Sequence, residues 1–154
     1  MISYSHLIQT MRRFMDLAMH HSMRASGQFT KAKGLSMPQF SILMQLHYRG
    51  ICGMSEVSER FEITPAAASQ LVDKLVQSGL IQRDEDPNDR RAKSLKLTDK
   101  GKGLIQEGIE QRYRWVEPMA EKLTAEERAK IHEALDIMTR AAMELDAERI
   151  QPAH

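Results

Sequence analysis

Apolar residues near the start of the chain recur every three or four positions, the spacing that places side chains on one face of an α-helix. They predict a helix from about Ser5 to the mid-twenties, with Gly27 and Gly34 as the residues that end the segment. The apolar positions outnumber those that one buried face needs, so we expect burial on more than one side, as in a dimer. They are Leu7, Met11, Phe14, Met15, Leu17, Ala18 and Met19.

Two shorter helices are expected next. The second helix is predicted to begin near Ser36, because Ser36 and Gln39 have the spacing of a capping box, and Gly50 is expected to end it. A short third helix is predicted over residues 55–61. One face of the second helix carries Phe40, Leu43, Met44 and His47.

The clearest helix begins after Thr64, which can cap it, with Pro65 at the first helical position, where a missing N–H costs nothing. It is predicted to run to Ser78, with Gly79 closing it. Its buried stripe is expected to be Ala68, Leu71, Val72 and Leu75. The opposite, small and polar face carries Pro65, Ala66, Ser69, Gln70, Asp73, Lys74 and Gln77.

The pattern that follows predicts a β-hairpin with a charged tip. A strand begins at residues 80–83, a turn-rich stretch covers 84–89, and residues 92–97 alternate between apolar and polar. Arg90 and Arg91 stand at the end of the turn. Taken alone, the helix face and the hairpin are also compatible with an ordinary solvated surface.

Together, the small-faced helix and the hairpin favour binding to DNA. A helix fits the major groove of B-DNA, where Ser69 and Gln70 can hydrogen-bond to base edges and Ala66 can touch a thymine methyl group. Arginines on a protruding turn suit the narrow minor groove. The N–H groups at the helix starts after Ser36 and Thr64 can hold phosphates. A winged helix that binds another protein instead of DNA is the alternative.

The hairpin and the residues directly after it have a specific spacing of Leu80, Ile81, Arg83, Asp86, Pro87, Asn88, Asp89, Arg90, Arg91, Leu95, Leu97, Thr98 and Gly101. These residues resemble the wing signature of the MarR family of winged-helix transcriptional regulators. The resemblance implies that Asp89 braces the wing through an ion pair, that Arg91 reaches into the minor groove, and that Arg90 contacts phosphate. The residues expected to contact DNA are Ser36, Thr64, Pro65, Ala66, Ser69, Gln70, Lys74, Arg90 and Arg91.

Helices are also predicted after the hairpin. Thr98 is expected to cap a fifth helix that Pro118 breaks or kinks, and Thr124 with Glu127 forms a capping box for the last helix. The last helix carries a seam typical of packing in a dimer, although packing against the chain's own core is the alternative. The seam consists of Ile131, Leu135, Met138, Ala142 and Leu145.

The expected fold class is therefore mainly α (α+β), with a winged helix-turn-helix between terminal dimerisation helices. Residues 1–35 form the N-terminal dimerisation helix, and residues 101–154 form the C-terminal dimerisation helices. Residues 36–100 form the DNA-binding domain, with a recognition helix at about 65–78 and a wing at about 80–97. The resemblance likewise implies a homodimer, and a twofold dimer predicts a palindromic site with recognition helices about 34 Å apart.

Composition and charge restrict the class of protein further. The 154 residues carry a net charge of only +1, but residues 1–50 hold six Lys and Arg against Asp16 alone, whereas residues 103–154 are acidic. No apolar run approaches the length of a membrane span and no signal peptide is visible, so a cytoplasmic protein is expected. The six histidines are scattered and no catalytic motif is present, so neither a metal, a cofactor nor an enzymatic activity is expected.

The sequence suggests two kinds of switch. The resemblance implies a small, aromatic or acidic effector in a cleft between the dimer helices and the winged helix, and methionine suits adaptable binding. Core packing is the alternative for most of the candidate residues. The second switch is oxidation of Cys52, but the family's redox cysteine lies near the start of the first helix, so we expect Cys52 to be structural. The effector-binding candidates are Met15, Met19, His20, Met44 and His47.

Overall fold

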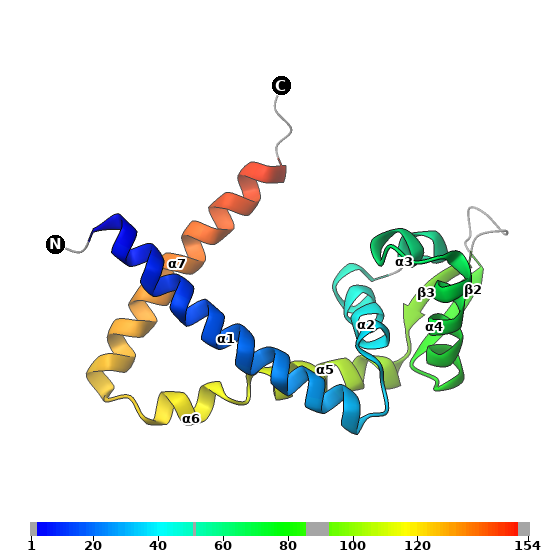
Figure 1. The fold of residues 1–154 in the computed structure, drawn as a ribbon, viewed down its shortest axis with the longest axis horizontal. Helices are drawn as coiled ribbons and strands as arrows, with labels where there is room; N and C mark the ends of the chain where they lie inside the picture. The colour runs from blue at the N-terminus through cyan, green and yellow to red at the C-terminus, as the bar shows by residue number, and fades with distance from the viewer. Residues whose placement is uncertain (1–2, 51, 86–92, 151–154) are drawn as a thin grey trace. The chain divides into compact units, whose positions relative to one another are not determined.

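The computed structural model describes residues 3–50, 52–85 and 93–150 and divides into two compact units, residues 1–113 and 114–154 (Figure 1). It is mostly helical with a small antiparallel sheet, so the predicted winged-helix fold class is confirmed. The first unit contains α1 (Tyr4–Ala32), α2 (Met37–Arg49), β1 (Cys52–Gly53), α3 (Met54–Arg60), α4 (Pro65–Gln77), β2 (Ile81–Glu85), β3 (Lys93–Leu97) and α5 (Asp99–Tyr113). The second contains α6 (Val116–Glu121) and α7 (Ala125–Ile150).

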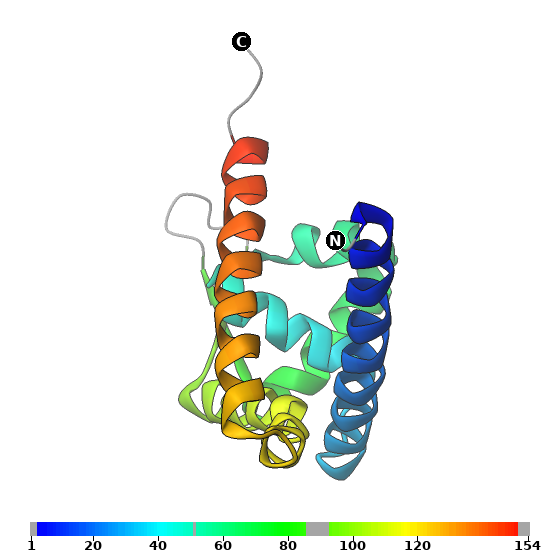
Figure 2. The ribbon, with the colours of Figure 1, turned by 90° about the vertical axis from the view of Figure 1, so that its left-hand side faces the viewer.

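Helix α1 is longer than its sequence pattern predicts. It continues through Gly27 to Ala32, as the unbroken blue helix of Figure 2 shows. Glycine weakens a helix interior, but the last two turns of α1 bury Phe29 and Thr30, and the Thr30 hydroxyl donates to the Gly27 carbonyl at 3.1 Å. Tertiary burial therefore outweighs the low propensity of Gly27.

The predicted helix caps are confirmed. At α2, the Gln39 backbone N–H donates to the Ser36 hydroxyl at 3.3 Å and the Ser36 N–H donates to the Gln39 side chain at 2.9 Å. At α7, Thr124 and Glu127 make the same reciprocal pair at 2.8 and 3.2 Å. Each box satisfies two backbone donors that a helix start leaves unpaired.

The sheet contains one strand that the sequence did not predict. Its order is β1-β3-β2, and all neighbours are antiparallel. The two-residue β1 places Cys52 opposite Leu95, while Leu95 also faces Arg83 of β2. A strand of two residues is too short to show an alternation of apolar and polar residues, so the sequence pattern does not predict it.

The core of the first unit lies between the end of α1, the helices α2, α3, α4 and α5, and the sheet. Rings of Phe29 and Phe40 meet edge to face at 5.8 Å, beside the buried Gly108 of α5. A Cβ at Gly108 would lie 2.9 Å from the Phe29 ring, so the glycine lets α5 approach these rings closely. The buried apolar residues are Phe29, Phe40, Ile42, Leu43, Leu46, Val57, Ala68, Val72, Leu75, Leu80, Ile81, Leu95 and Ile105.

The expected effect of Pro118 on the fifth helix is wrong. Helix α5 already ends at Tyr113, and Pro118 lies in the first turn of α6, where a proline removes no helical hydrogen bond. The continuous helix α7, orange to red in Figure 2, has no buried residue among those whose burial is described. Of the helices that the structure describes, none has both the length and the hydropathy needed to cross a membrane.

Candidate nucleic-acid interface and effector pocket

Helices α3 and α4 and the turn between them form a helix-turn-helix. Glu62 stands in the turn with φ at 51°, a left-handed conformation that tightens the chain between the helices. The Thr64 hydroxyl accepts the Ala67 N–H at 3.2 Å and begins α4 as predicted. Ala68, Val72 and Leu75 are buried and Leu71 is half-buried, so the predicted inward stripe of α4 is confirmed.

The face of α4 predicted to meet DNA is open to solvent. Its first two turns expose Thr64, Pro65, Ala66 and Gln70, and Lys74 follows, while Ser69 is half-buried. Small side chains at the start of the helix leave the backbone free to approach a partner closely. Ser36 is also exposed, but its hydroxyl is occupied by the cap of α2. The exposed small and polar side chains suit contact with base edges in the major groove of DNA.

Asp73, on the polar face that the helix pattern predicts, makes an ion pair that the pattern does not indicate. Its Oδ1 accepts from Nη2 of Arg83 on β2 at 2.6 Å. No spacing in the sequence indicates this contact, because the two residues belong to different elements and their side chains meet only after the hairpin folds back. The ion pair ties the exposed side of α4 to the first strand of the hairpin.

A second ion pair lies within the hairpin itself. Lys96 of β3 pairs with Asp84 of β2, and the Gln82 amide also donates to Asp84 at 3.2 Å. The hydrogen bond from Lys96 and, after it, that from Gln82 lower the pKa of Asp84 below its ordinary value. The predicted wing residues Asp89, Arg90 and Arg91 lie outside the described part of the chain.

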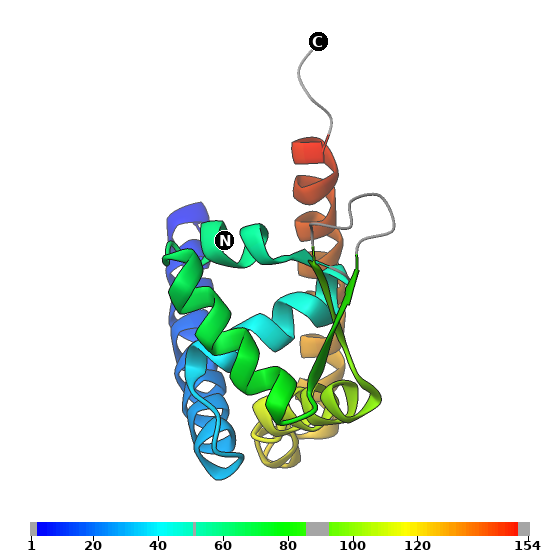
Figure 3. The ribbon, with the colours of Figure 1, turned by 90° about the vertical axis from the view of Figure 1, so that its right-hand side faces the viewer.

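The turn from α4 to β2 is anchored to the start of α5. The Thr98 hydroxyl donates to the Gly79 carbonyl at 2.6 Å and accepts the Gly101 N–H at 3.1 Å, so Thr98 caps α5 as predicted. Lys100 Nζ donates to the Ser78 carbonyl at 2.8 Å. Figure 3 shows α4 in green descending to this turn, from which the hairpin rises. The end of α4 therefore has a fixed position relative to α5.

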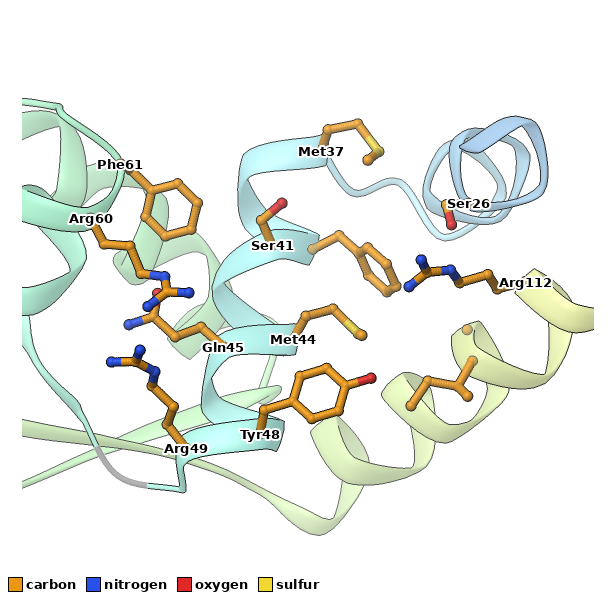
Figure 4. A pocket seen from close by; sticks show the side chains of 13 residues that line it. Ser26, Met37, Ser41, Met44, Gln45, Tyr48, Arg49, Arg60, Phe61 and Arg112 are labelled. Atoms are coloured by element: carbon orange, nitrogen blue, oxygen red, sulfur yellow. The ribbon is translucent and has the colours of Figure 1, made fainter. Parts of the chain in front are cut away.

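A pocket of about 390 Å³ lies within the first unit, between α1, α2, the end of α3 and α5. Figure 4 shows Arg49 and Arg60 extending toward each other beside Gln45, while Arg112 approaches from α5. No ion-pair partner of Arg49 or Arg60 occurs among the residues that the structure describes. Oε1 of the buried Gln45 has no hydrogen-bond partner within the same described residues.

The pocket includes only one of the predicted effector residues. Met44 lines it, whereas His47 lines a separate, more open hollow beside β3 and α5. Met15, Met19 and His20 lie on α1 outside both, and Met15 and Met19 are 57% and 60% exposed, so the alternative that they belong to this chain's own core is wrong. The three pocket arginines were missed, although each stands in the last turn of its helix, a position that the sequence alone marks only as favourable for a cation.

Comparisons with known proteins agree with this geometry. A sequence model of the MarR family matches residues 35–93. An uncharacterized HTH-type transcriptional regulator, YfiV of Bacillus subtilis, is 30% identical over 107 residues, which span 70% of this chain and 67% of YfiV. The transcriptional regulator Tm0710 of Thermotoga maritima is similar in structure, with a TM-score of 0.82, 26% identity, and coverage of 91% of this chain and 98% of Tm0710. A mutant of MepR from S. aureus bound to an oligodeoxyribonucleotide shares the fold, with a TM-score of 0.65, 20% identity, and coverage of 92% and 99%.

Proposed function

Since the chain belongs to the MarR family of DNA-binding transcriptional regulators, we propose that it is a homodimeric repressor of a palindromic operator, released by a small anionic effector. The observation that carries the DNA-binding part is the exposed face of α4, small at its start and held beside the β-hairpin. Ser69 and Gln70 would read base edges, and Ser36, Thr64, Pro65, Ala66 and Lys74 would complete the surface. Arg91 would enter the minor groove, Arg90 would contact phosphate and Asp89 would brace the wing.

The dimer is proposed from apolar side chains that the single chain leaves exposed. On α1 these include Leu7, Phe14 and Leu17, and on α7 they include Leu135 and Leu145. Exposed apolar surface of this extent on two long helices is typical of a subunit interface. We therefore assign dimerisation to residues 1–35 and 101–154, and DNA binding to residues 36–100.

A twofold dimer sets the geometry of the operator. Two recognition helices one turn of DNA apart, about 34 Å, read two half-sites that are related by the same twofold axis. A dimer seated on such a site inside a promoter blocks access to it, so repression by occlusion is the simplest mode of action.

The proposed effector site is the pocket with three arginines. A guanidinium stays charged at any physiological pH, and Arg49 and Arg60 approach each other with no anionic partner among the described residues. An acid group beside them would relieve this repulsion, and the apolar surface of Phe40, Met44 and Phe61 would cover a ring-sized body. The pocket reaches α5, which also holds the end of α4, so a ligand there has a physical connection to the recognition helix.

The operator is tested by selecting duplexes from a random pool with the purified protein. The proposal predicts enrichment of an inverted repeat whose half-site centres are about 10 base pairs apart. Enrichment of a lone half-site would contradict the dimeric mode, and no enrichment at all would contradict selective binding.

The effector site is tested on the selected duplex with benzoate as the probe and benzyl alcohol as its uncharged counterpart. We expect benzoate, and not benzyl alcohol, to release the duplex from the wild type. Arg60→Ala should abolish that response and keep DNA binding, whereas Arg24→Ala, which removes an exposed arginine outside the pocket, should respond like the wild type. An unchanged response of Arg60→Ala would refute the assignment of the pocket.

A further inference from the structure

We propose that Arg83 is a positioning residue for the recognition helix. Its ion pair with Asp73 sets the angle of α4 to the hairpin and neutralises a carboxylate on the side of α4 that faces DNA. The inference rests on DNA binding through α4 and concerns a residue that itself makes no contact with the nucleic acid.

The ion pair joins α4 to the hairpin at a point that is distant from the turn between them. Helix α4 is joined to the hairpin at its C-terminal end, where the turn at Ser78 and Gly79 is held by α5. The inner face of α4 packs on the core through Ala68, Val72 and Leu75. The bond from Arg83 to Asp73, 2.6 Å long and more than one helical turn away from the C-terminal end, attaches the exposed side of α4 to the hairpin as well and so fixes the angle between them.

The base of the Arg83 side chain lies on β2, an edge strand that pairs with the central strand β3. In the sheet register Arg83 stands opposite Leu95, which is fully buried and central in the three strands. A side chain that starts from a strand paired along its length with the central strand has a defined starting position. Through Arg83, Asp73 is therefore held by the paired strands of the hairpin rather than by a surface loop.

Charge gives the pair its second role. Asp73 lies one turn beyond Ser69 and Gln70, and 46% of its side chain is exposed. An unpaired carboxylate there would repel the phosphates of any duplex bound to α4. The Arg83 side chain is only 26% exposed and its Nε is buried with no hydrogen-bond partner among the described residues, so its charge is directed at Asp73 rather than outward.

Two other roles are physically possible and predict different results. If Arg83 bound a phosphate directly, replacing it would weaken operator binding by the same factor whether or not Asp73 is present. If the pair were an ordinary surface ion pair, its loss would change little, because exposed pairs are worth little. Only the proposed role, in which Arg83 also neutralises Asp73, makes the unpaired Asp73 carboxylate more harmful than the absence of both side chains.

A double-mutant cycle on the selected operator separates these roles. We expect Arg83→Ala to weaken operator binding about tenfold, or about 1.4 kcal/mol, with unchanged helix content. The double variant Asp73→Ala/Arg83→Ala should regain part of that loss, and Arg83→Lys, which keeps the charge, should bind close to the wild type. Lys96→Ala breaks the ion pair between Lys96 and Asp84, which joins β3 to β2 and involves no residue of α4, and serves as the matched control with near-wild-type binding.

Several outcomes would overturn the proposal. A double variant that binds as poorly as Arg83→Ala would indicate a direct phosphate contact, and wild-type binding by Arg83→Ala would indicate an ordinary surface pair. Equal losses in Lys96→Ala would mean that any weakening of the hairpin suffices. Should Arg83→Ala fail to fold, Arg83→Gln and Asp73→Asn/Arg83→Gln form the same cycle with smaller changes of shape. Failure of the wild type to select an operator is a separate result, which contradicts the proposed function instead.

Discussion

Replacing Gly101 by alanine should be among the most damaging small changes in the first unit. A Cβ built on Gly101 would lie 2.0 Å from the carbonyl oxygen of Leu80 and 3.2 Å from Cδ2 of Leu97. The first of these is a backbone atom in the turn that joins α4 to β2. It cannot rotate away as a side chain would, so α5 or the turn must move.

The expected cost follows from what that movement breaks. The same Leu80 carbonyl accepts the Thr98 N–H at 3.1 Å and lies 3.2 Å from the Thr98 hydroxyl. Over-packing costs about 1–3 kcal/mol, and each hydrogen bond lost adds about 1 kcal/mol. The better helix propensity of alanine offsets about 1 kcal/mol of this loss in stability. We therefore expect Gly101→Ala to lower the free energy of unfolding by about 2–4 kcal/mol.

The assay is urea unfolding followed by circular dichroism at one fixed protein concentration, because a dimer's apparent stability depends on concentration. Gly103→Ala is the matched control: it lies in the same helix and its Cβ would meet nothing within 4 Å. The control should be stabilised by about 0.5–1 kcal/mol through helix propensity alone. If Gly101→Ala were as stable as Gly103→Ala, the close approach of α5 to the turn would be refuted.

Three further predictions concern a cap, an ionised carboxylate and the wing. Thr124→Ala should cost about 1 kcal/mol in urea unfolding, because the α7 cap is lost; an unchanged midpoint would count against it. The pKa of Asp84 is lowered in the folded protein from its ordinary 3.8, so its stabilisation is complete above that value and is lost as pH falls through the folded pKa. Acid titration of the wild type should therefore lose more stability below about pH 4 than Asp84→Asn, and coinciding curves would exclude this contribution. Arg91→Ala should weaken operator binding without changing helix content, and full affinity would refute its minor-groove role.

The sequence predicted the local elements well, because their signals are themselves local. Serine or threonine three residues before glutamine or glutamate marks a capping box without knowledge of the fold, and both boxes formed. The inward stripe of α4 follows from its period in the same way. The resemblance carried by the hairpin then supplied the way in which these elements pack into a winged helix, which periodicity alone leaves open.

The errors and omissions share a physical cause, since they depend on contacts between distant segments. Burial of Phe29 carried α1 past Gly27, against local propensity. The ion pair between Asp73 and Arg83 exists only after the hairpin returns to α4. The pocket arginines come from three different helices, and no spacing in the sequence links them. The roles of individual residues in DNA binding stay predictions, because no partner defines them.

The central claim is selective, electrostatically assisted binding to an operator, and fluorescence anisotropy over a salt series tests it most directly. The selected duplex and a scrambled duplex of the same composition would each be titrated with the full chain. We predict nanomolar binding of the selected duplex, with log affinity falling against log salt by about 0.9 for each phosphate neutralised, and much weaker binding of the scrambled one. Equal affinity for both duplexes, or affinity that does not change with salt, would contradict the account.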